Sequence, residues 1–172
     1  MNSNMRTLLE KLSLDYSEVS PQPKSKQLMT ILEAGIVSQR NAFLLVRLMS
    51  ETTEEHHFQD LTDKECSINH FHVQDYLPSG IDLRRCLTEA IAFVKALEES
   101  LTSQYSSVFR IILACDNDEP SNCVIRFHKL RDDEPPWLLI DKLEDYAEEA
   151  ILVIDTDGSF PADEDKTRRS IQ

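Results

Sequence analysis

DLRRCLTEAIAFVKALEESL, residues 82–101, is the longest regular pattern in the chain. Its apolar side chains recur at alternating steps of four and three residues, so a helix over this stretch keeps one face apolar through about five turns. That face consists of Leu83, Leu87, Ala90, Val94, Leu97 and Leu101. Cys86 and Ile91 widen the face, and we therefore expect the helix to lie flat across a sheet. Ser79, followed by Asp82, is expected to begin the helix with a capping box.

Two β-strands are expected after this helix, at 108–115 (VFRIILAC) and 123–130 (CVIRFHKL). The segment between them, DNDEPSN, is rich in turn-forming residues, so the two strands should form an antiparallel hairpin. Alternation along the second strand places Arg126 and His128 on one face and Ile125 and Phe127 on the other. The hairpin and the long helix together indicate a sheet covered by a helix.

Weaker patterns predict the remaining elements. Asn2 or Ser3 is expected to cap a first short helix, and Ser25 and Gly35 are expected to bound a second one. The predicted elements are helices at 5–12 and 25–35, a buried strand at 41–49, a polar loop at 52–65, a strand at 66–73, a short helix at 141–149 and a buried strand at 150–155.

This order of elements predicts an α+β fold. We expect a mostly antiparallel sheet of about five strands, with the long amphipathic helix (about 82–101) and the N-terminal helices packed against it. The chain should divide into an N-terminal helical segment at 1–35, a single α+β domain at 36–155 and a disordered tail at 156–172. With 172 residues, of which 41% are hydrophobic, the chain can bury a substantial core.

The composition excludes several classes of protein. The chain has three glycines, too few and too scattered for a glycine-rich phosphate loop. Its four cysteines form no C-x-x-C pair, so we expect reduced cysteines, mostly buried, in a cytoplasmic protein. No apolar run is long enough for a signal peptide or a membrane span, and we expect no membrane association.

The charge is strongly acidic and unevenly distributed. The chain carries 31 acidic and 18 basic side chains, a net charge of -13, and residues 116–165 alone hold 16 acidic and 4 basic ones. Such a chain should repel nucleic acid and anionic membranes, and its partners should be basic proteins. The alternative is that the acidic block only keeps the protein in solution, which needs a net charge of roughly 2–8.

Histidines are the main candidates for chemistry. His70 and His72 would share one side of a strand, Cys66 precedes them, and His128 could join them from another strand, so a metal site is conceivable. The spacing lacks a second zinc-binding half, which favours ordinary strand histidines. There is no G-x-S-x-G and no H-E-x-x-H sequence, and Asp116–Glu119 lacks the EF-hand spacing. We therefore predict no catalytic residue, no metal and no cofactor.

The segment EPPWLLIDKLEDYAEEAILVID, residues 134–155, combines the aromatic Trp137, an acidic short helix and an apolar strand. It resembles the C-terminal segment of bacterial immunity proteins from polymorphic-toxin or contact-dependent growth-inhibition systems. The resemblance implies a cytosolic, acidic, single-domain protein without catalytic activity. It also implies that the protein binds a cognate toxin domain, often a basic nuclease, and occludes its active site. The oligomeric state stays open.

The candidate partner-binding residues are the acidic side chains of the late third of the chain and one aromatic residue. Carboxylates there can occupy a positive cleft that evolved for phosphate, and an aromatic side chain can anchor the contact. The candidates are Asp116, Asp118, Glu119, Asp132, Asp133, Glu134, Trp137, Asp141, Glu144, Asp145 and Glu148. For Trp137, and also for Tyr146, packing in the core is the alternative.

Two other functions remain open at this point. The acidic block could belong to an adaptor, or to a nucleic-acid mimic that acts on DNA-handling proteins. Alternatively, His70, His72 and His128 could form the centre of a small metal-binding enzyme.

Overall fold

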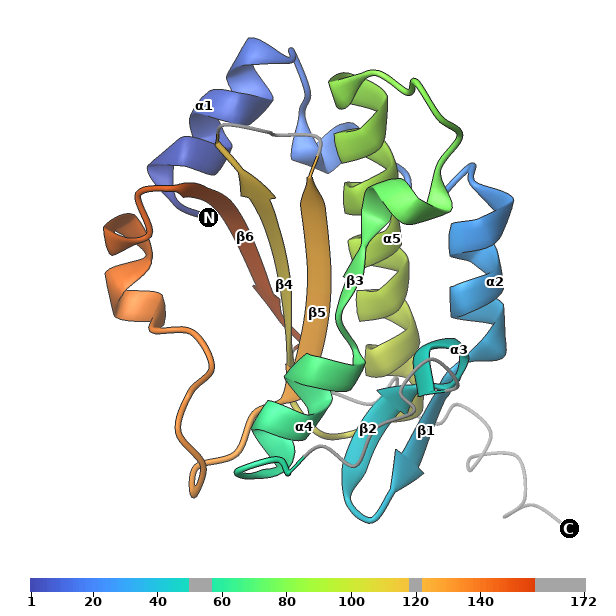
Figure 1. The fold of residues 1–172 in the computed structure, drawn as a ribbon, viewed down its shortest axis with the longest axis vertical. Helices are drawn as coiled ribbons and strands as arrows, with labels where there is room; N and C mark the ends of the chain where they lie inside the picture. The colour runs from blue at the N-terminus through green and yellow to red at the C-terminus, as the bar shows by residue number, and fades with distance from the viewer. Residues whose placement is uncertain (50–56, 118–121, 157–172) are drawn as a thin grey trace, which may run out of the picture.

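The computed structural model describes residues 1–49, 57–117 and 122–156 (Figure 1). The α-helices are α1 (Ser3–Lys11), α2 (Lys26–Ala34), α3 (Val46–Met49), α4 (Leu61–Ile68) and α5 (Leu83–Gln104), and the 3₁₀ helices are η1 (Tyr16–Glu18), η2 (Val73–Tyr76) and η3 (Ile140–Asp145). The strands are β1 (Ile36–Gln39), β2 (Ala42–Leu45), β3 (Phe71–His72), β4 (Phe109–Asp116), β5 (Cys123–Lys129) and β6 (Glu149–Asp155).

The main sheet has four strands in the order β3-β5-β4-β6, and all its neighbouring strands are antiparallel. The predicted hairpin is confirmed as β4 and β5, in which Cys115 lies opposite Cys123. The predicted strand at 150–155 is confirmed as β6, which pairs with the other side of β4. Strands β1 and β2 form a separate two-stranded sheet. The α+β class is therefore confirmed, with its strands divided between two sheets.

Helix α5 crosses one face of the main sheet, as its periodicity predicts (Figure 1). The alternate residues of β4, β5 and β6 that face it are buried, including Phe109, Phe127 and Leu152. Each large apolar side chain buried there contributes about 1.5–3 kcal/mol. The helix begins one residue after Asp82, whose side chain accepts a hydrogen bond from the Arg85 backbone. The N-cap is therefore Asp82 itself, and the predicted role of Ser79 is wrong.

The two N-terminal helices are confirmed, and they join the same core from different sides. Helix α2 packs against α5, begins after Ser25 and ends at Gly35, whose φ of 78° suits glycine. Helix α1 lies beside β6. Its N-cap, Asn2, donates its backbone N–H to Ile151 O (3.0 Å) and accepts the Ile151 N–H at its Oδ1 (2.9 Å). Asn2 thereby pairs the outer edge of β6, and side chains of α1 and α2 lie in the same core as α5 and the sheet.

The predicted strand at 41–49 is only partly correct. Strand β2 covers its first half, and the rest forms the short helix α3. A strand that the sequence did not reveal, β1, precedes it and pairs with it through a two-residue turn at Arg40 and Asn41. Both turn residues have positive φ (51° and 66°), the geometry that matches the twist of a tight hairpin. Asparagine adopts positive φ more readily than most residues, whereas arginine does not. The Arg40–Asn41 pair therefore does not indicate a hairpin turn from sequence alone.

The predicted loop at 52–65 and strand at 66–73 are also corrected. Residues 50–56 lie outside the described part of the chain, and Leu61–Ile68 forms helix α4, which Asp60 caps by accepting the Asp63 N–H (2.7 Å). Only Phe71 and His72 are in strand conformation, at the edge of the sheet next to β5. Because β3 is so short, it leaves the rest of the β5 edge without a neighbouring strand.

Side chains of α4 occupy that gap between β5 and β2. Glu65, which is fully buried, accepts hydrogen bonds from the backbone N–H groups of Phe43 and Lys129 (2.7 Å each). Asn69, one turn later, accepts the Leu45 N–H (2.9 Å) and donates to Phe127 O (3.1 Å). The side chains of Glu65 and Asn69 thus make hydrogen bonds to the backbone of both β2 and β5.

A buried ion pair completes this junction. Arg131 donates to both carboxylate oxygens of Glu65 (2.6 and 2.9 Å) and to the backbone oxygens of Asn41 and Lys129. The Glu65 charge is therefore matched by a guanidinium and by two N–H donors, which is the condition under which a carboxylate can be fully buried. We call Glu65, Asn69 and Arg131 the α4 junction.

The cysteines are buried, as predicted. Cys86, Cys115 and Cys123 meet between α5 and the sheet, and the Sγ atoms of Cys115 and Cys123 lie 2.6 Å apart. The predicted tail at 156–172 falls outside the described residues except for Thr156, which is buried and bonded to the Phe109 backbone. No helix in the described ranges is both long and apolar enough to cross a membrane.

We expect Glu65→Ala to destabilise the protein by about 3–5 kcal/mol, because it leaves Arg131 buried without its carboxylate and two backbone N–H groups without acceptors. Urea unfolding followed by circular dichroism measures this difference. Glu33→Ala is the matched control, since Glu33 is an exposed glutamate on α2, and it should change the stability by less than about 0.5 kcal/mol. Equal effects of the two variants would show that the α4 junction is not a stabilising element.

Candidate functional site

An acidic depression lies where β4, β6 and the segment that follows η3 meet. It has a volume of about 410 Å³ and is lined by Asp116, Asp145, Tyr146, Ala147, Glu148 and Glu149. Asp116 and Glu149 lie directly opposite each other on adjacent strands. Asn117 joins the two sides, because its backbone N–H donates to Glu148 O (3.0 Å) and its side chain donates to Ala147 O (2.8 Å). The backbone therefore sets the spacing of the carboxylates.

The charge of this depression has one sign. Its four carboxylate side chains are exposed, and none of the described residues that line it is basic. Like charges held this close repel one another, so a cationic group that enters the depression relieves the repulsion. The arrangement suits a lysine or arginine of another protein.

Three of the sequence-predicted residues, Asp116, Asp145 and Glu148, meet in this depression. Glu149 belongs with them, although it is not among the predicted partner-binding residues. Glu149 directly precedes the predicted strand at 150–155. That position could have indicated its place, because the first residue of a strand lies at the rim of the sheet. Asp118 and Glu119 lie outside the described part of the chain.

Two other predicted residues have internal partners. Glu144 accepts the Ser3 N–H (3.0 and 3.1 Å) and a hydrogen bond from Arg6 (3.0 Å), which lowers the pKa of its carboxyl group. It thus neutralises the N-terminus of α1. Glu134 accepts the Thr62 N–H (2.7 Å) at the start of α4. Burial raises the pKa of Glu134, but the bonds to Thr62 and the charge of Arg131 outweigh it and lower the pKa. Both residues hold the fold together.

The remaining predicted residues are scattered. Asp132, Asp133 and Asp141 are exposed but lie outside the acidic depression. Trp137 is exposed over 40% of its surface and lies beside Arg126. Tyr146 lines the depression and is half-buried against a small apolar cluster around Ile112, Leu138 and Ile151 on the outer face of the sheet.

The three histidines do not converge. His70 and His72 have their ring centroids 5.1 Å apart, and His72 Nδ1 lies 2.9 Å from Asn122 Oδ1. His72 pairs with Val124 on β5. His128 lies four residues further along that strand, roughly 13 Å from Val124. Its Nδ1 lies 3.0 Å from Lys129 O, and its buried Nε2 has no partner among the described residues.

Cys66 lies on α4, so the predicted strand face of Cys66, His70 and His72 does not form. In the residues that the structure describes, no group of three or more His, Cys, Asp or Glu side chains is placed to hold a metal ion.

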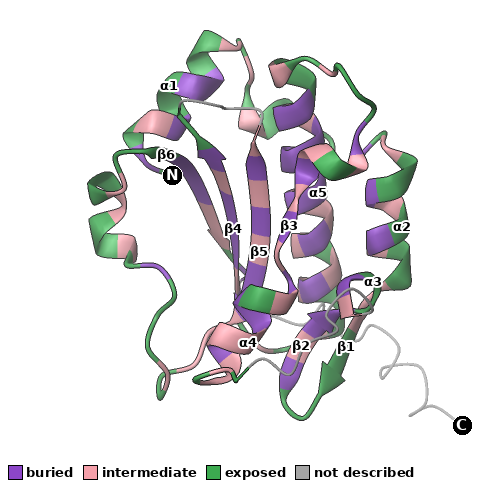
Figure 2. Cartoon of the chain, in the orientation of Figure 1, coloured by how far each residue is buried: buried purple, intermediate pink, exposed green. Residues whose placement is uncertain are grey.

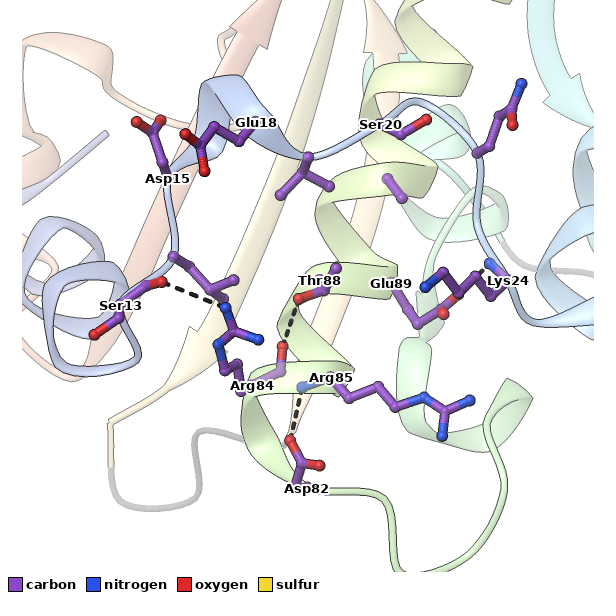
Figure 3. Close-up of a pocket in the computed structure, with 14 residues that line it drawn as sticks. Ser13, Asp15, Glu18, Ser20, Lys24, Asp82, Arg84, Arg85, Thr88 and Glu89 are labelled. Atoms are coloured by element: carbon purple, nitrogen blue, oxygen red, sulfur yellow. Dashed lines mark hydrogen bonds between the residues drawn. The ribbon is translucent and has the colours of Figure 1, made fainter.

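A larger groove, of about 570 Å³, lies between residues 13–24 and the first half of α5 (Figure 3). Its charged side chains have both signs: Lys24, Arg84 and Arg85 against Asp15, Glu18, Asp82 and Glu89. Several of them hold the groove itself together. Arg84 Nε donates to Leu12 O (3.0 Å), and the buried Glu89 accepts the backbone N–H groups of Lys24 and Ser25. This mixed lining suits a cationic partner less well than the acidic depression does.

The family model described as "Uncharacterized protein PM0498 family" matches residues 1–169. The match therefore spans every described element, from α1 to β6. No curated protein and no solved structure matches the chain.

We expect Glu144→Gln to destabilise the protein at neutral pH but not in acid. The folded-state pKa of Glu144 is lowered from 4.5, so its contribution is present above pH 4.5 and is lost as the pH falls through the folded pKa. Protonated Glu144 then resembles the glutamine of the variant. Urea midpoints of both proteins at pH 7 and at progressively lower pH measure the effect. A gap between the midpoints that stays constant on acidification would contradict this role.

Proposed function

The chain belongs to the family described as Uncharacterized protein PM0498, and we propose that it is a non-catalytic immunity protein. In this proposal it resides in the cytoplasm and neutralises a cognate basic toxin domain, a nuclease, by covering its active site. The observation that carries the proposal is the acidic depression: four exposed carboxylates with no basic residue among the described lining.

A nuclease has to present a positive cleft to the phosphates of its substrate. Carboxylates held at a comparable spacing compete with phosphate for the same lysines and arginines. Asp116 and Glu149 are held opposite each other by the β4–β6 register, and Glu148 is held through its backbone bond to Asn117. Because this backbone is already ordered, little conformational entropy is lost on binding.

The strong overall charge supports the same proposal. A net charge of -13 accelerates the encounter with a basic protein, and a toxin that degrades nucleic acid has to be captured quickly. Tyr146, at the edge of the depression, can add an aromatic contact of the kind that dominates protein interfaces.

The direct test is inhibition of the toxin domain encoded immediately upstream of this gene. The purified toxin domain is mixed with increasing amounts of this chain, and cleavage of nucleic acid is measured. We expect inhibition to be complete near one equivalent, and co-expression to protect cells from the toxin. If the chain neither binds nor inhibits that domain, the proposal fails, and capture of DNA-handling proteins would instead favour the adaptor or mimic.

We expect the triple variant Asp145→Asn, Glu148→Gln, Glu149→Gln to associate with the basic toxin domain about tenfold more slowly at ~10 mM salt. The difference should shrink towards ~150 mM salt, because the lost contribution is long-range attraction. Stopped-flow or surface plasmon resonance measures these rates.

The matched control removes three other exposed carboxylates, those of Glu33, Asp75 and Glu99, which lie on α2, η2 and α5. Both triple variants have the same net charge. If the control slows association as much as the first variant does, only the total charge matters and the acidic depression is not the binding surface.

A further inference from the structure

Arg126 lies near the centre of the outer face of the main sheet, the face opposite α5. Figure 2 shows the alternation of buried and half-buried residues along β5, and Arg126 belongs to the half-buried set. On β4 its cross-strand neighbour is Ile112. On the other side, the pairing of Phe71 with Ile125 places His70, one residue before β3, beside Arg126. The η3 segment and α4 cover the outer face on either side (Figure 1).

The guanidinium of Arg126 makes neither a hydrogen bond nor an ion pair with another described residue. Other arginines of the protein differ in this respect. Arg110 makes a two-fold contact with Asp155 (2.6 and 2.7 Å), and Arg131 makes one with Glu65. In a chain with 31 acidic side chains, a half-buried arginine without a carboxylate is unusual. Burial lowers the pKa of Arg126 and outweighs the opposite effects of Cys66 and of the Glu149 carboxylate, so a bound anion would stabilise its charge.

The indole of Trp137 lies next to this guanidinium. The Arg126 Cζ atom lies 5.3 Å from the centroid of the indole ring, within the range of a cation–π contact. A cation–π contact is not a hydrogen bond, so the N–H donors of Arg126 have no acceptor among the described residues. Trp137 is 40% exposed, so its indole offers an apolar surface beside Arg126.

The number of positive charges around Arg126 determines which charge a ligand can carry. Burial and the neighbouring charges of Arg126 and His72 lower the pKa of His70 to about 4, so His70 is neutral at pH 7. One fixed positive charge remains, and it lies in an acidic molecule. A monoanion matches it, whereas a dianionic phosphate would meet uncompensated repulsion. The planar fork of N–H donors matches the two oxygens of a carboxylate.

We propose that the outer face of β5 carries a carboxylate-binding site. Arg126 supplies the charge and the paired N–H donors, Trp137 supplies an apolar wall, and His70 adds a neutral hydrogen-bonding group. The ligand is a carboxylate attached to an apolar group, either a free organic acid or an acidic side chain of another protein. The site goes beyond the toxin-binding role, because it binds an anion and does not depend on the acidic depression.

The chain has a single tryptophan, so the indole N–H resonance of Trp137 is an unambiguous reporter of this site. The experiment follows that resonance by NMR at about pH 8, where inorganic phosphate is mainly the dianion, while sodium benzoate, sodium acetate or sodium phosphate is added at constant ionic strength. We expect a saturable shift with benzoate, at least a few-fold weaker binding of acetate, which lacks the apolar body, and no saturable shift with phosphate.

Variants test the assignment to Arg126. Arg126→Gln should weaken benzoate binding about tenfold or more, a change of ~1.4 kcal/mol. Arg126→Lys keeps the positive charge but lacks the paired N–H donors, so it should weaken benzoate binding by an intermediate factor. This variant replaces the glutamine variant if the latter does not fold. Arg85→Gln is the matched control, since Arg85 is an exposed arginine in the groove on α5, and it should leave binding unchanged.

A blocked dipeptide, acetyl-Phe-Glu-amide, distinguishes the two sources of the carboxylate. Binding of the peptide at least as tightly as benzoate would identify a side chain of another protein as the ligand, and weaker binding would identify a free acid. Either outcome supports the site. The proposal is overturned if no carboxylate shifts the Trp137 resonance saturably, if phosphate binds as well as benzoate, or if Arg126→Gln binds as the wild type does. None of these results bears on inhibition of the toxin domain.

Discussion

The carboxylate of Glu65 is the constraint on which the architecture depends. It is fully buried, and it bonds backbone N–H groups of β2 and β5 that belong to different sheets. A buried charge without compensation would be prohibitive, so Arg131 has to lie against it. That requirement fixes the path of the chain directly after β5. The segment that leaves the α4 junction then returns along the outer face of the sheet to η3 and β6.

The acidic side chains of this protein divide into two groups by their partners. Glu65, Glu89, Glu134 and Glu144 accept hydrogen bonds from backbone N–H groups, and three of these four bond a helix start or the residues just before it. Each offsets the partial positive charge of a helix N-terminus or satisfies a strand edge. The side chains of Asp145, Glu148 and Glu149 in the acidic depression accept no such hydrogen bond from the described residues, and they are exposed where a basic partner can reach them.

The two faces of the main sheet have different characters for a physical reason. The inner face is covered by α5 and, next to β6, by α1, and it is apolar. The outer face is covered only in part, by the small cluster around Leu138 and by α4, so it can hold polar residues between these covers. Arg126 and Trp137 lie between these two covers, and the acidic depression lies at the edge of the same sheet, where β4 and β6 meet the segment after η3. An anion site and a cation-attracting surface thus occupy one side of the molecule.

Local sequence alone determined the long helix, the β4–β5 hairpin, β6 and both N-terminal helices, because each depends on periodicity or a cap within a few residues. It could not reveal α4, since Glu65 and Asn69 are polar residues that are buried only because two distant strands bond to them. The same limit applies to the surface. The composition indicated an acidic face, but tertiary structure decided that Glu144 serves the start of α1, 141 residues away, while Asp116 and Glu149 share a rim. Hydrogen-bond partners far apart in the chain are set by the packing of whole elements, and no local pattern encodes them.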